Sequence, residues 1–390
     1  MTFPDHGRVL FSATLVRGHI AKFHIPYLKW FKEQGWETWV AARNDYPDGV
    51  CEIPYCDCFV NIDFARSPFS KQTAVAYGQL RDLLSHEHFD LIHTHTPVAS
   101  VLTRLAARDA RRHATKVLYT AHGFHFYDGA PLANWLLWYP VERVMSRFTD
   151  VLITINREDY DRAARFAHCR VEYVPGVGID TKRFSKAVDG AAKRGELGYR
   201  AEDVVVLGVG DLIKRKNHQA IIRALALLDE RFKLCLCGTG VEHEALRLLA
   251  EEQGVADRVA FLGFRNDIRE LMKMADMLVF PSIHEGLPVA VMEAMASGLP
   301  VIAAKIRGIY PDLIQDGESG MLLADDRPET IAAAITSMEG DSEARRRIAS
   351  TAREAVRAFD CADAVLGRVT ALYESCSQPT SHAGSVAAEE

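Results

Sequence analysis

Two glutamates flank a turn that leads into a helix. The segment 282–300 (SIHEGLPVAVMEAMASGLP) follows a short apolar run and turns at Gly286 and Leu287. Pro288 suits the first turn of a helix, where its missing N–H costs nothing. Free backbone N–H groups at such a turn, together with the helix dipole, form an anion site. Glu285 and Glu293 can each accept two hydroxyl hydrogen bonds, as a sugar or ribose diol requires. A capping role for Glu285 and a solvated position for Glu293 would explain the same spacing.

Three consecutive cations follow another apolar run. Lys214, Arg215 and Lys216 stand in the segment 209–218 (VGDLIKRKNH), just before a helical pattern. Cations beside a helix start would neutralise a diphosphate without a metal ion. A solvated basic turn is the alternative. The sequence does not choose between Lys214 and Arg215 as the second cation beside Lys216.

Two further loops of the second half are candidates for ligand contact. Gly238 and Gly240 separate a strand pattern from a helical one, and glycine permits close approach of the backbone. Such strand–glycine–helix turns are common. Phe264 and Arg265 follow the next strand pattern. The guanidinium of Arg265 can stack on a nucleotide base or pair with Asp267, and the sequence leaves both readings open.

Histidines end two strand patterns of the first half. His95 ends the run 91–95 and His122 ends the run 117–122. A histidine at the carboxyl edge of a parallel sheet can face a ligand cleft and donate a hydrogen bond near neutral pH. A hydrogen-bonded structural role or a packing role is the alternative for both.

The glutamate pair carries a resemblance to a known family. Glu285 and Glu293 match the Glu-x7-Glu pair of retaining glycosyltransferases with two Rossmann-like domains, and EGLPVAVMEAMASGLPVIA (285–303) strongly resembles family 4 of that class. The resemblance implies that Glu285 contacts the donor sugar and Glu293 the nucleotide ribose. It implies that the N–H groups around Gly286, Leu287 and the neighbours of Pro288 serve the sugar and diphosphate. It also assigns Lys216 to the diphosphate.

The resemblance extends to the other loops. It places the segment of Phe264 and Arg265 at the nucleotide base, and His122 against the donor sugar from the opposite domain. Relatives carry Arg directly after the glycine of the cation loop, where this chain has Asp211. Many relatives also have a double glycine after the first strand, which lets the backbone approach donor or acceptor. This chain has Gly18 alone at that place, and Gly18 is expected to contact the donor.

The segment 121–160 (AHGFHFYDGAPLANWLLWYPVERVMSRFTDVLITINREDY) resembles a narrower group of bacterial enzymes that build capsule, exopolysaccharide or N-glycan precursors on a lipid carrier. This makes His125 a second cleft candidate, and His95 resembles a cleft residue of the family. Arg17 or Lys22 could meet an acceptor phosphate. We therefore expect a UDP-sugar donor and a polyprenyl-diphosphate-linked saccharide acceptor, with no metal or other cofactor.

Composition excludes several classes of protein. With 390 residues, 48% hydrophobic and 25% charged, the chain is an ordinary globular one. The net charge of −6 gives no sign of nucleic-acid binding. Residues 1–175 contain 20 Lys and Arg against 19 Asp and Glu, a net charge of +1, which leaves −7 for the remainder. Neither group of clustered cysteines (51, 56 and 58; 235 and 237) has zinc-ligand spacing, so buried thiols are expected.

The alternation of strand and helix patterns predicts the elements that position these loops. Strands are expected at 8–14, 38–43, 91–95, 117–122, 151–156 and 171–175, and again at 204–210, 233–238, 259–264, 277–281 and 300–304. Such alternation is typical of parallel sheets covered on both faces. The charged stretch 180–200 is expected to be a linker.

The alternation predicts an α/β chain with two Rossmann-like doubly wound domains that face a central cleft, and the resemblance to family 4 implies the GT-B class. The predicted units are 1–178 with a returning helix 357–376, a nucleotide-sugar domain 179–356, and a disordered tail 377–390. The resemblance also implies that the last helix crosses back to the first domain.

Membrane contact is open at this stage. No apolar run is long enough to span a bilayer, and no signal pattern begins the chain, so a cytoplasmic protein is expected. Lys22–Lys32 and Asn134–Pro140 mix aromatic with nearby basic residues. Such stretches suit the inner face of the plasma membrane, or their tryptophans belong to the core. Two other functions remain alternatives, namely a UDP-sugar 2-epimerase of the same fold and a non-catalytic nucleotide-sugar binder.

Overall fold

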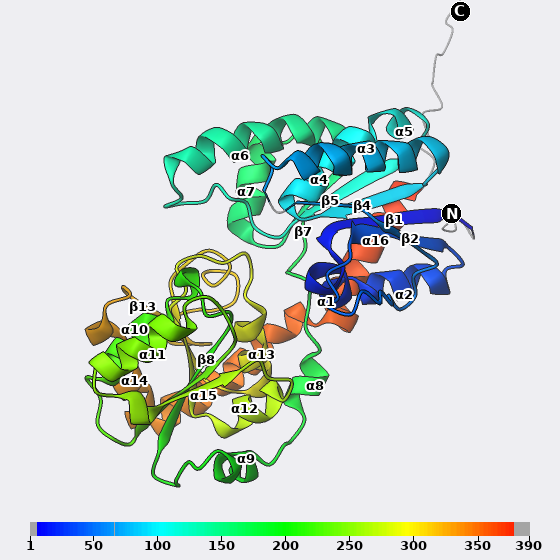
Figure 1. Cartoon of the computed structure of the whole chain (residues 1–390). Helices are drawn as coiled ribbons and strands as arrows, with labels where there is room; N and C mark the ends of the chain where they lie inside the picture. Colours follow the sequence, from blue (N-terminus) through cyan, green and yellow to red (C-terminus); the bar gives the residue numbers. More distant parts are fainter. Residues whose placement is uncertain (1–5, 66, 378–390) are drawn as a thin grey trace, which may run out of the picture.

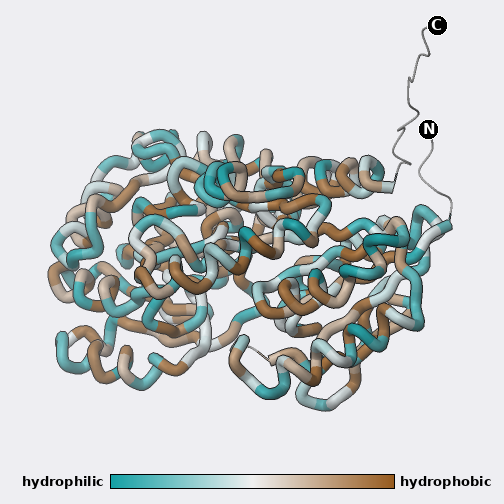
Figure 2. Tube along the Cα trace, turned by 90° about the horizontal axis from the view of Figure 1, so that it is seen from above, coloured by the Kyte–Doolittle hydropathy of each residue, from teal (hydrophilic) through white to brown (hydrophobic). Residues whose placement is uncertain are grey.

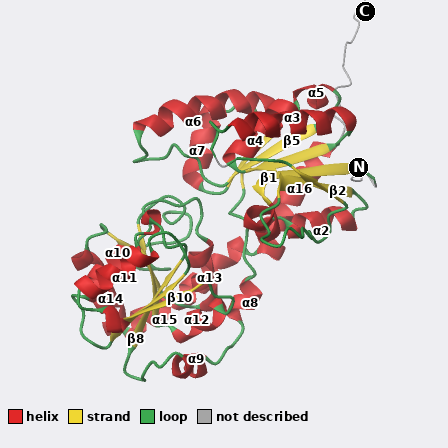
Figure 3. Cartoon of the chain, viewed as in Figure 1, coloured by secondary structure: helices red, strands yellow, loops and turns green. Residues whose placement is uncertain are grey.

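Two parallel β-sheets, each covered by helices on both faces, form the two lobes of the molecule (Figure 1). The structure is a computed structural model and describes residues 6–65 and 67–377. The strand order of the first sheet is β3-β2-β1-β4-β5-β6-β7, and that of the second is β10-β9-β8-β11-β12-β13. Figure 3 shows the strands of each lobe enclosed by helices. The expected α/β class with two doubly wound domains is confirmed.

The strands of the first sheet are β1 (Arg8–Leu15), β2 (Glu37–Arg43), β3 (Cys58–Asn61), β4 (Leu91–His95), β5 (Lys116–Ala121), β6 (Val151–Thr154) and β7 (Arg170–Tyr173). Those of the second are β8 (Val204–Val209), β9 (Phe232–Cys237), β10 (Val259–Gly263), β11 (Met277–Phe280), β12 (Val301–Ala304) and β13 (Met321–Leu323). Chain order reverses between β1 and β4 and between β8 and β11. Ligand crevices of doubly wound sheets lie at such switch points.

The helices of the first lobe form two layers. Those below the sheet in Figure 1 are α1 (Ala21–Phe23), α2 (Ile25–Glu33) and α16 (Leu366–Ser377), and those above it include α3 (Lys71–His86), α4 (Pro97–Ala106), α5 (Arg108–Arg112) and α6 (Leu132–Met145). A further helix, α7 (Arg157–Phe166), packs with α6 near β5 and β6. Successive residues of β1 point to opposite faces, so Leu10 packs with the α3–α4 layer and Phe11 with α2 and α16.

The second lobe is layered in the same way. On one face of its sheet lie α10 (His218–Leu225), α11 (His243–Glu252) and α14 (Pro328–Gly340), and on the other α12 (Ile268–Met274) and α13 (Val289–Ser297). The helix α15 (Ser342–Ala355) contributes Ile348 to the core of the first face and Ala352 to that of the second. In Figure 2 the helices alternate between hydrophilic and hydrophobic residues along their length, as amphipathic helices that cover a sheet do.

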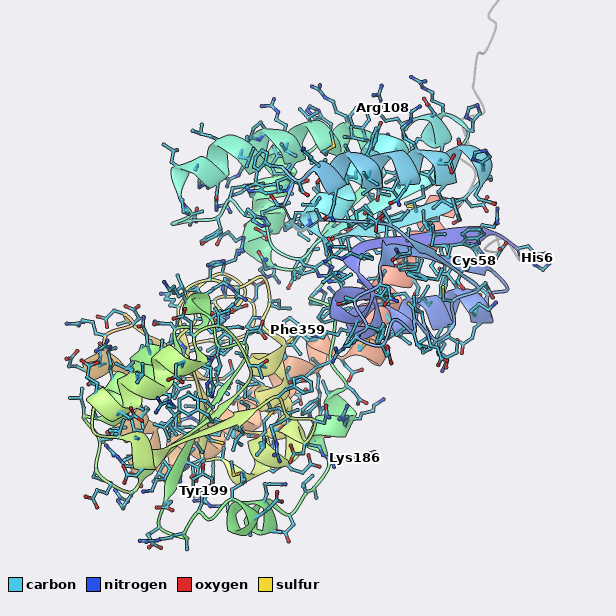
Figure 4. All side chains as sticks on the ribbon, viewed as in Figure 1. His6, Cys58, Arg108, Lys186, Tyr199 and Phe359 are labelled. Atoms are coloured by element: carbon cyan, nitrogen blue, oxygen red, sulfur yellow. The ribbon has the colours of Figure 1, made fainter. Side chains whose placement is uncertain are left out.

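The last helix returns to the first lobe, as expected. Val369, Leu372 and Tyr373 of α16 are buried in the cluster that contains Phe11 of β1 and Phe31 of α2. The chain crosses beside its first passage between the lobes, where Cys361 N donates to Ile179 O at 2.8 Å. Phe359, labelled in Figure 4, lies near this junction.

The expected linker is only partly irregular. Within 180–200 the chain forms α8 (Thr181–Ser185) and α9 (Gly190–Glu196), and Phe184 is buried in the core of the second lobe. Asp180 and Asp189 cap these helices through their side chains, which is how a charged, small-residue stretch becomes helical. The predicted tail lies outside the described residues from 378 onward. In the described part of the chain no helix is long and apolar enough to cross a bilayer.

Candidate active site

Glu285 lies in the loop between β11 and α13, and its carboxylate is held by two cations. Its Oε1 atom is 2.5 Å from Arg215 Nη1 and 2.8 Å from Lys216 Nζ, and it accepts a hydrogen bond from Ser282 Oγ at 2.6 Å. Burial by itself raises the pKa of this carboxyl group. The charges of Lys216 and Arg215 and the hydrogen bonds from Lys216 and Ser282 outweigh it, so the pKa of Glu285 is lowered. The group is a buried carboxylate.

The turn Lys214–Lys216 aims the two cations at this carboxylate. It is a single 3₁₀ turn after β8, and Asn217 at φ +54° ends it and starts α10. Lys216 crosses Gly210, where an added Cβ would lie 3.1 Å from Lys216 Cε, and its Nζ stands 4.7 Å from the centre of the Phe280 ring. Ile283 N donates to Arg215 O at 2.9 Å, which ties the cation loop to the Glu285 loop.

Lys214 points elsewhere. Its side chain is exposed and lines a hollow of about 700 Å³ between α10 and α11, whereas Arg215 and Lys216 turn toward Glu285. Neither Glu285 nor His122 lines that hollow. The structure therefore brings Arg215 and Lys216, and not Lys214, to the glutamate.

The turn at Gly286 is pressed between the two lobes. A Cβ atom on Gly286 would lie 2.1 Å from His122 O of the first lobe, and one on Gly308 would lie 2.1 Å from Gly286 O. Asn156 Nδ2 donates to Gly286 O at 3.1 Å from the end of β6. Only glycine leaves room for so close an approach.

Arg307 is a buried residue of this interface that the sequence did not indicate. Its Nε donates to Glu285 O at 2.9 Å, and its Nη1 donates to Phe124 O at 2.9 Å and Asp159 Oδ1 at 3.0 Å. Asp159 also accepts from Asn156 Nδ2 at 2.9 Å. Its position in the chain could have indicated this role, because Arg307 follows β12 and therefore lies at the same sheet edge as Glu285.

Both lobes line a pocket of about 410 Å³ at this point. Its walls include His122, His125, Tyr127, Arg215, Glu285, Gly286 and Arg307. Tyr127 of the first lobe stacks on His284 of the second, with ring centres 4.9 Å apart and planes 24° apart. The pocket therefore joins the guanidinium groups of Arg215 and Arg307, a carboxylate and a glycine turn to histidines of the opposite lobe.

The two pocket histidines differ in setting. Burial lowers the pKa of His122 to about 4, so its ring is neutral at pH 7. His122 Nε2 lies 3.4 Å from Nδ1 of His95, which is buried below it. His125 is exposed and stacks on Trp138 of α6 at 4.7 Å between ring centres.

Glu293 lies one turn into α13, away from these contacts. Burial raises its pKa to about 7, although the charge of Arg183 on α8 acts in the opposite direction. Pro288 is the N-cap rather than the first helical residue, because its ψ of 113° is extended and the helix begins at Val289. Leu287 is buried and fills the space beside Gly176.

Gly238 and Gly240, which are predicted to bind the donor, pack against the backbone of the chain itself. A Cβ on Gly238 would lie 1.9 Å from Gly210 O, and one on Gly240 would lie 2.3 Å from Leu212 O. Their close approach is thus to the backbone of the cation loop, which they support. Donor contact by these glycines stays a prediction.

Arg265, at the end of β10, forms the predicted pair with Asp267. Arg265 Nε and Nη2 pair with the two carboxylate oxygens of Asp267 at 2.7 and 2.5 Å. Phe264 beside it is 71% exposed. The structure thus shows the pair of Arg265 with Asp267, and contact of Arg265 or Phe264 with a nucleotide base stays a prediction.

The loop after β1 is anchored by an acid that was not predicted. Asp45 accepts hydrogen bonds from Arg17 N at 2.6 Å and Gly18 N at 3.0 Å, so this turn holds a carboxylate of its own chain. The side chains of Arg17 and Lys22 are exposed. Both acceptor assignments stay predictions, as does that of His95.

One family model matches each of the two lobes. The model described as "Glycosyltransferase Family 4" matches residues 27–183, and that described as "Glycosyl transferases group 1" matches residues 190–355. The crystal structure of Anabaena Alr3699/HepE in complex with UDP and glucose superposes with a TM-score of 0.77 at 22% identity, covering 95% of this chain and all of that one. This structural likeness shows the fold.

Sequence relatives carry the family. EpsD of Bacillus subtilis (strain 168), whose name places it among glycosyltransferases, is 42% identical over 90% of this chain and 92% of its own length. The UDP-Gal:alpha-D-GlcNAc-diphosphoundecaprenol alpha-1,3-galactosyltransferase of Escherichia coli is 30% identical over 59% of this chain and 61% of its own. The chain belongs to the family 4 glycosyltransferases of GT-B fold.

Proposed function

We propose that this glycosyltransferase moves a hexose or N-acetylhexosamine from a UDP-sugar to a lipid-linked saccharide, with retention of the anomeric configuration, in the synthesis of a bacterial surface polysaccharide or glycan. The observation that carries the proposal is the Glu285 carboxylate held by Lys216 and Arg215 in a pocket that both lobes line. The Escherichia coli relative supports it, because its name specifies a UDP-sugar donor and a lipid diphosphate acceptor.

The reaction begins with departure of the diphosphate. A sugar held through its hydroxyl groups by Glu285 has its diphosphate beside Lys216 and Arg215, since these cations lie within 2.8 Å of that carboxylate. The cations and the N–H groups of the Gly286 turn stabilise the charge that develops on the leaving group. This role needs no metal ion.

The acceptor hydroxyl attacks from the face that the diphosphate leaves. Its proton passes to a leaving phosphate oxygen, so no protein base is required. His122 is neutral and contacts the sugar from the first lobe. Glu293 holds the ribose, and the exposed ring of Phe264 offers the base a stacking surface.

The lipid-linked acceptor approaches along the first lobe. Leu132 and Leu136 on α6 are 72% and 70% exposed, and Arg143 lies further along the same helix face. Trp135 and Trp138 instead pack against the core of this lobe. We propose that α6 rests on the anionic inner face of the plasma membrane through these two leucines and Arg143, with Arg17, Lys22, His95 and His125 on the acceptor side.

The test is a reaction with and without acceptor. UDP-sugars are incubated with the purified chain and vesicles that carry a polyprenyl-diphosphate-linked monosaccharide, and products are identified by mass spectrometry and NMR. Transfer of one sugar with retained configuration is expected, and Glu285→Ala abolishes it. Epimerisation of UDP-sugar without acceptor would identify an epimerase instead. If wild type binds a UDP-sugar but transfers no more sugar than Glu285→Ala does, the protein is a non-catalytic binder.

A further inference from the structure

Four histidines from separate segments meet at the carboxyl edge of the first sheet. They are His19 in the π-helical turn Val16–Ile20, His24 between α1 and α2, His95 at the end of β4, and His122 just after β5. One ring nitrogen of each lies within 4.8 Å of those of the other three. Because β1, β4 and β5 are parallel neighbours, the segments that follow them meet at one edge.

Several nitrogens of this cluster are buried without a hydrogen-bond partner. They are Nε2 of His19, both ring nitrogens of His24, and Nε2 of His95. His93, two residues before His95 on the same face of β4, is fully paired with Tyr373 Oη at 2.6 Å and Thr120 Oγ1 at 2.8 Å. Buried polar atoms in folded proteins nearly always have a partner. The unpaired nitrogens therefore indicate a bound group.

The spacing suits a tetrahedral transition metal. Zn–N bonds of about 2.0–2.1 Å place neighbouring ligand nitrogens about 3.4 Å apart in a tetrahedral site. His95 Nδ1 and His122 Nε2 are 3.4 Å apart. His95 would therefore bind the ion through Nδ1, and the unpaired nitrogens that the ion would satisfy are Nε2 of His19 and one nitrogen of His24. The rings of His24 and His95 are stacked with centres 3.8 Å apart, and those of His19 and His122 meet edge to face at 4.7 Å, so these rings would turn toward a common centre when the ion binds.

The ligand type narrows the choice of ion. Among the described residues the group consists of imidazoles alone, with no carboxylate or thiolate. Imidazole suits zinc and its neighbours in the first transition row, whereas Mg²⁺ and Ca²⁺ require oxygen ligands. Phe11 and Phe23 lie against the histidine rings and give the cluster an apolar wall.

From these contacts we propose that His19, His24, His95 and His122 bind one Zn²⁺ ion. The ion would fasten the turn Val16–Ile20 and α1, on the side of the first lobe nearest the second in Figure 1, to the ends of β4 and β5. The site goes beyond the proposed function, but shares His122 and His95 with it. A ring nitrogen that coordinates zinc cannot also contact a sugar, so zinc is expected to inhibit transfer.

Zinc binding is measured by calorimetry on the full chain, produced without a histidine tag and stripped with a chelator. One Zn²⁺ per chain is expected at pH 7.5. The variants His24→Phe and His95→Asn should weaken binding by at least about tenfold, since loss of even an outer-sphere partner costs that much. The exposed His86→Ala is the matched control and should bind like wild type.

Two outcomes would overturn the site. One is wild type that takes up no zinc, in which case water or sugar hydroxyls serve the nitrogens. The other is binding that both cluster variants retain. X-ray absorption of the zinc-loaded wild type decides the matter even if a variant misfolds, because only a shell of imidazole nitrogens agrees with the proposal. These readouts need no glycosyl transfer, so the zinc site and the proposed function can fail separately.

Discussion

Arg307 Nη1 and Asp159 Oδ1 lie 3.0 Å apart and form a buried ion pair between the lobes. Their side chains are 4% and 0% exposed. The same guanidinium donates from Nε to Glu285 O at 2.9 Å. The position of the Glu285 backbone is therefore coupled to contact with the first lobe, so an interface residue supports the glutamate proposed to hold the sugar.

Replacing Arg307 by Ala should destabilise the chain strongly. The change leaves Asp159 buried without its cation and costs roughly 3–5 kcal/mol in free energy of unfolding. Urea unfolding measures this loss. Arg327→Ala removes an exposed pair with Asp325 and is the control, with an expected change within about 1 kcal/mol. Equal effects of the two substitutions would contradict a structural role for the interlobe pair.

The strands and the loops at their carboxyl ends could be predicted because their signals are local. Each predicted apolar run became a strand within a residue or two, and the candidate loops follow those strands. The edge strands β3 and β13 were not predicted. They are short, and β3 is only partly buried, so they lack a long apolar run.

Residues whose roles depend on contact between lobes could not be predicted. Arg307, Asn156 and Asp159 are ordinary polar residues in sequence, and only the juxtaposition of two sheet edges joins them. Similarly, the direction of each cation in Lys214–Lys216 depends on one 3₁₀ turn, which sends neighbouring side chains to different sides.

Alanine substitutions of Lys214, Arg215 and Lys216 should differ in their effect on kcat/KM for the donor. Lys216→Ala and Arg215→Ala each remove a charged partner of Glu285 and of the proposed diphosphate, which is worth about 1.5–3 kcal/mol. That corresponds to a loss of roughly 10- to 150-fold in kcat/KM for the UDP-sugar. Lys214→Ala is the matched control and should stay near wild type, because Lys214 points to the α10–α11 hollow. A larger loss in Lys214→Ala than in Arg215→Ala would refute the assignment.

Glu293 should make donor binding depend on pH near neutrality. Its pKa is raised to about 7, so the carboxylate that accepts ribose hydroxyl hydrogen bonds forms only as the pH rises through that value. Donor affinity should therefore increase with pH across 7 in wild type. In Glu293→Gln the affinity should be weaker above pH 7 and flat across it. Calorimetry with UDP measures both profiles, and a wild-type profile that stays flat would rule out Glu293 as the ribose acceptor.

The same residue should affect stability with a definite sign. The folded pKa of about 7 lies above the ordinary value of 4.5, so the folded chain binds this proton more tightly than the unfolded chain. The contribution to stability is full below pH 4.5 and is lost as the pH rises through 7. Glu293→Gln should therefore be more stable than wild type above pH 7, by on the order of 1–3 kcal/mol. Thermal unfolding at acid and alkaline pH measures this difference. If Glu293→Gln were more stable than wild type only at acid pH, the pKa of Glu293 would not be raised.

A methyl group at Gly286 should force the lobes apart at the candidate site. An added Cβ would lie 2.1 Å from His122 O, which is backbone and cannot rotate away. Gly286→Ala should therefore reduce sugar transfer sharply while the helix content seen by circular dichroism is kept. Gly78→Ala is the control, because its Cβ meets no atom within 4 Å inside α3, and helix propensity predicts a gain of about 1 kcal/mol in stability. Small-angle scattering would show a more open Gly286→Ala. If that variant stayed as compact and as active as wild type, close contact between the Gly286 turn and His122 would not be needed for the reaction.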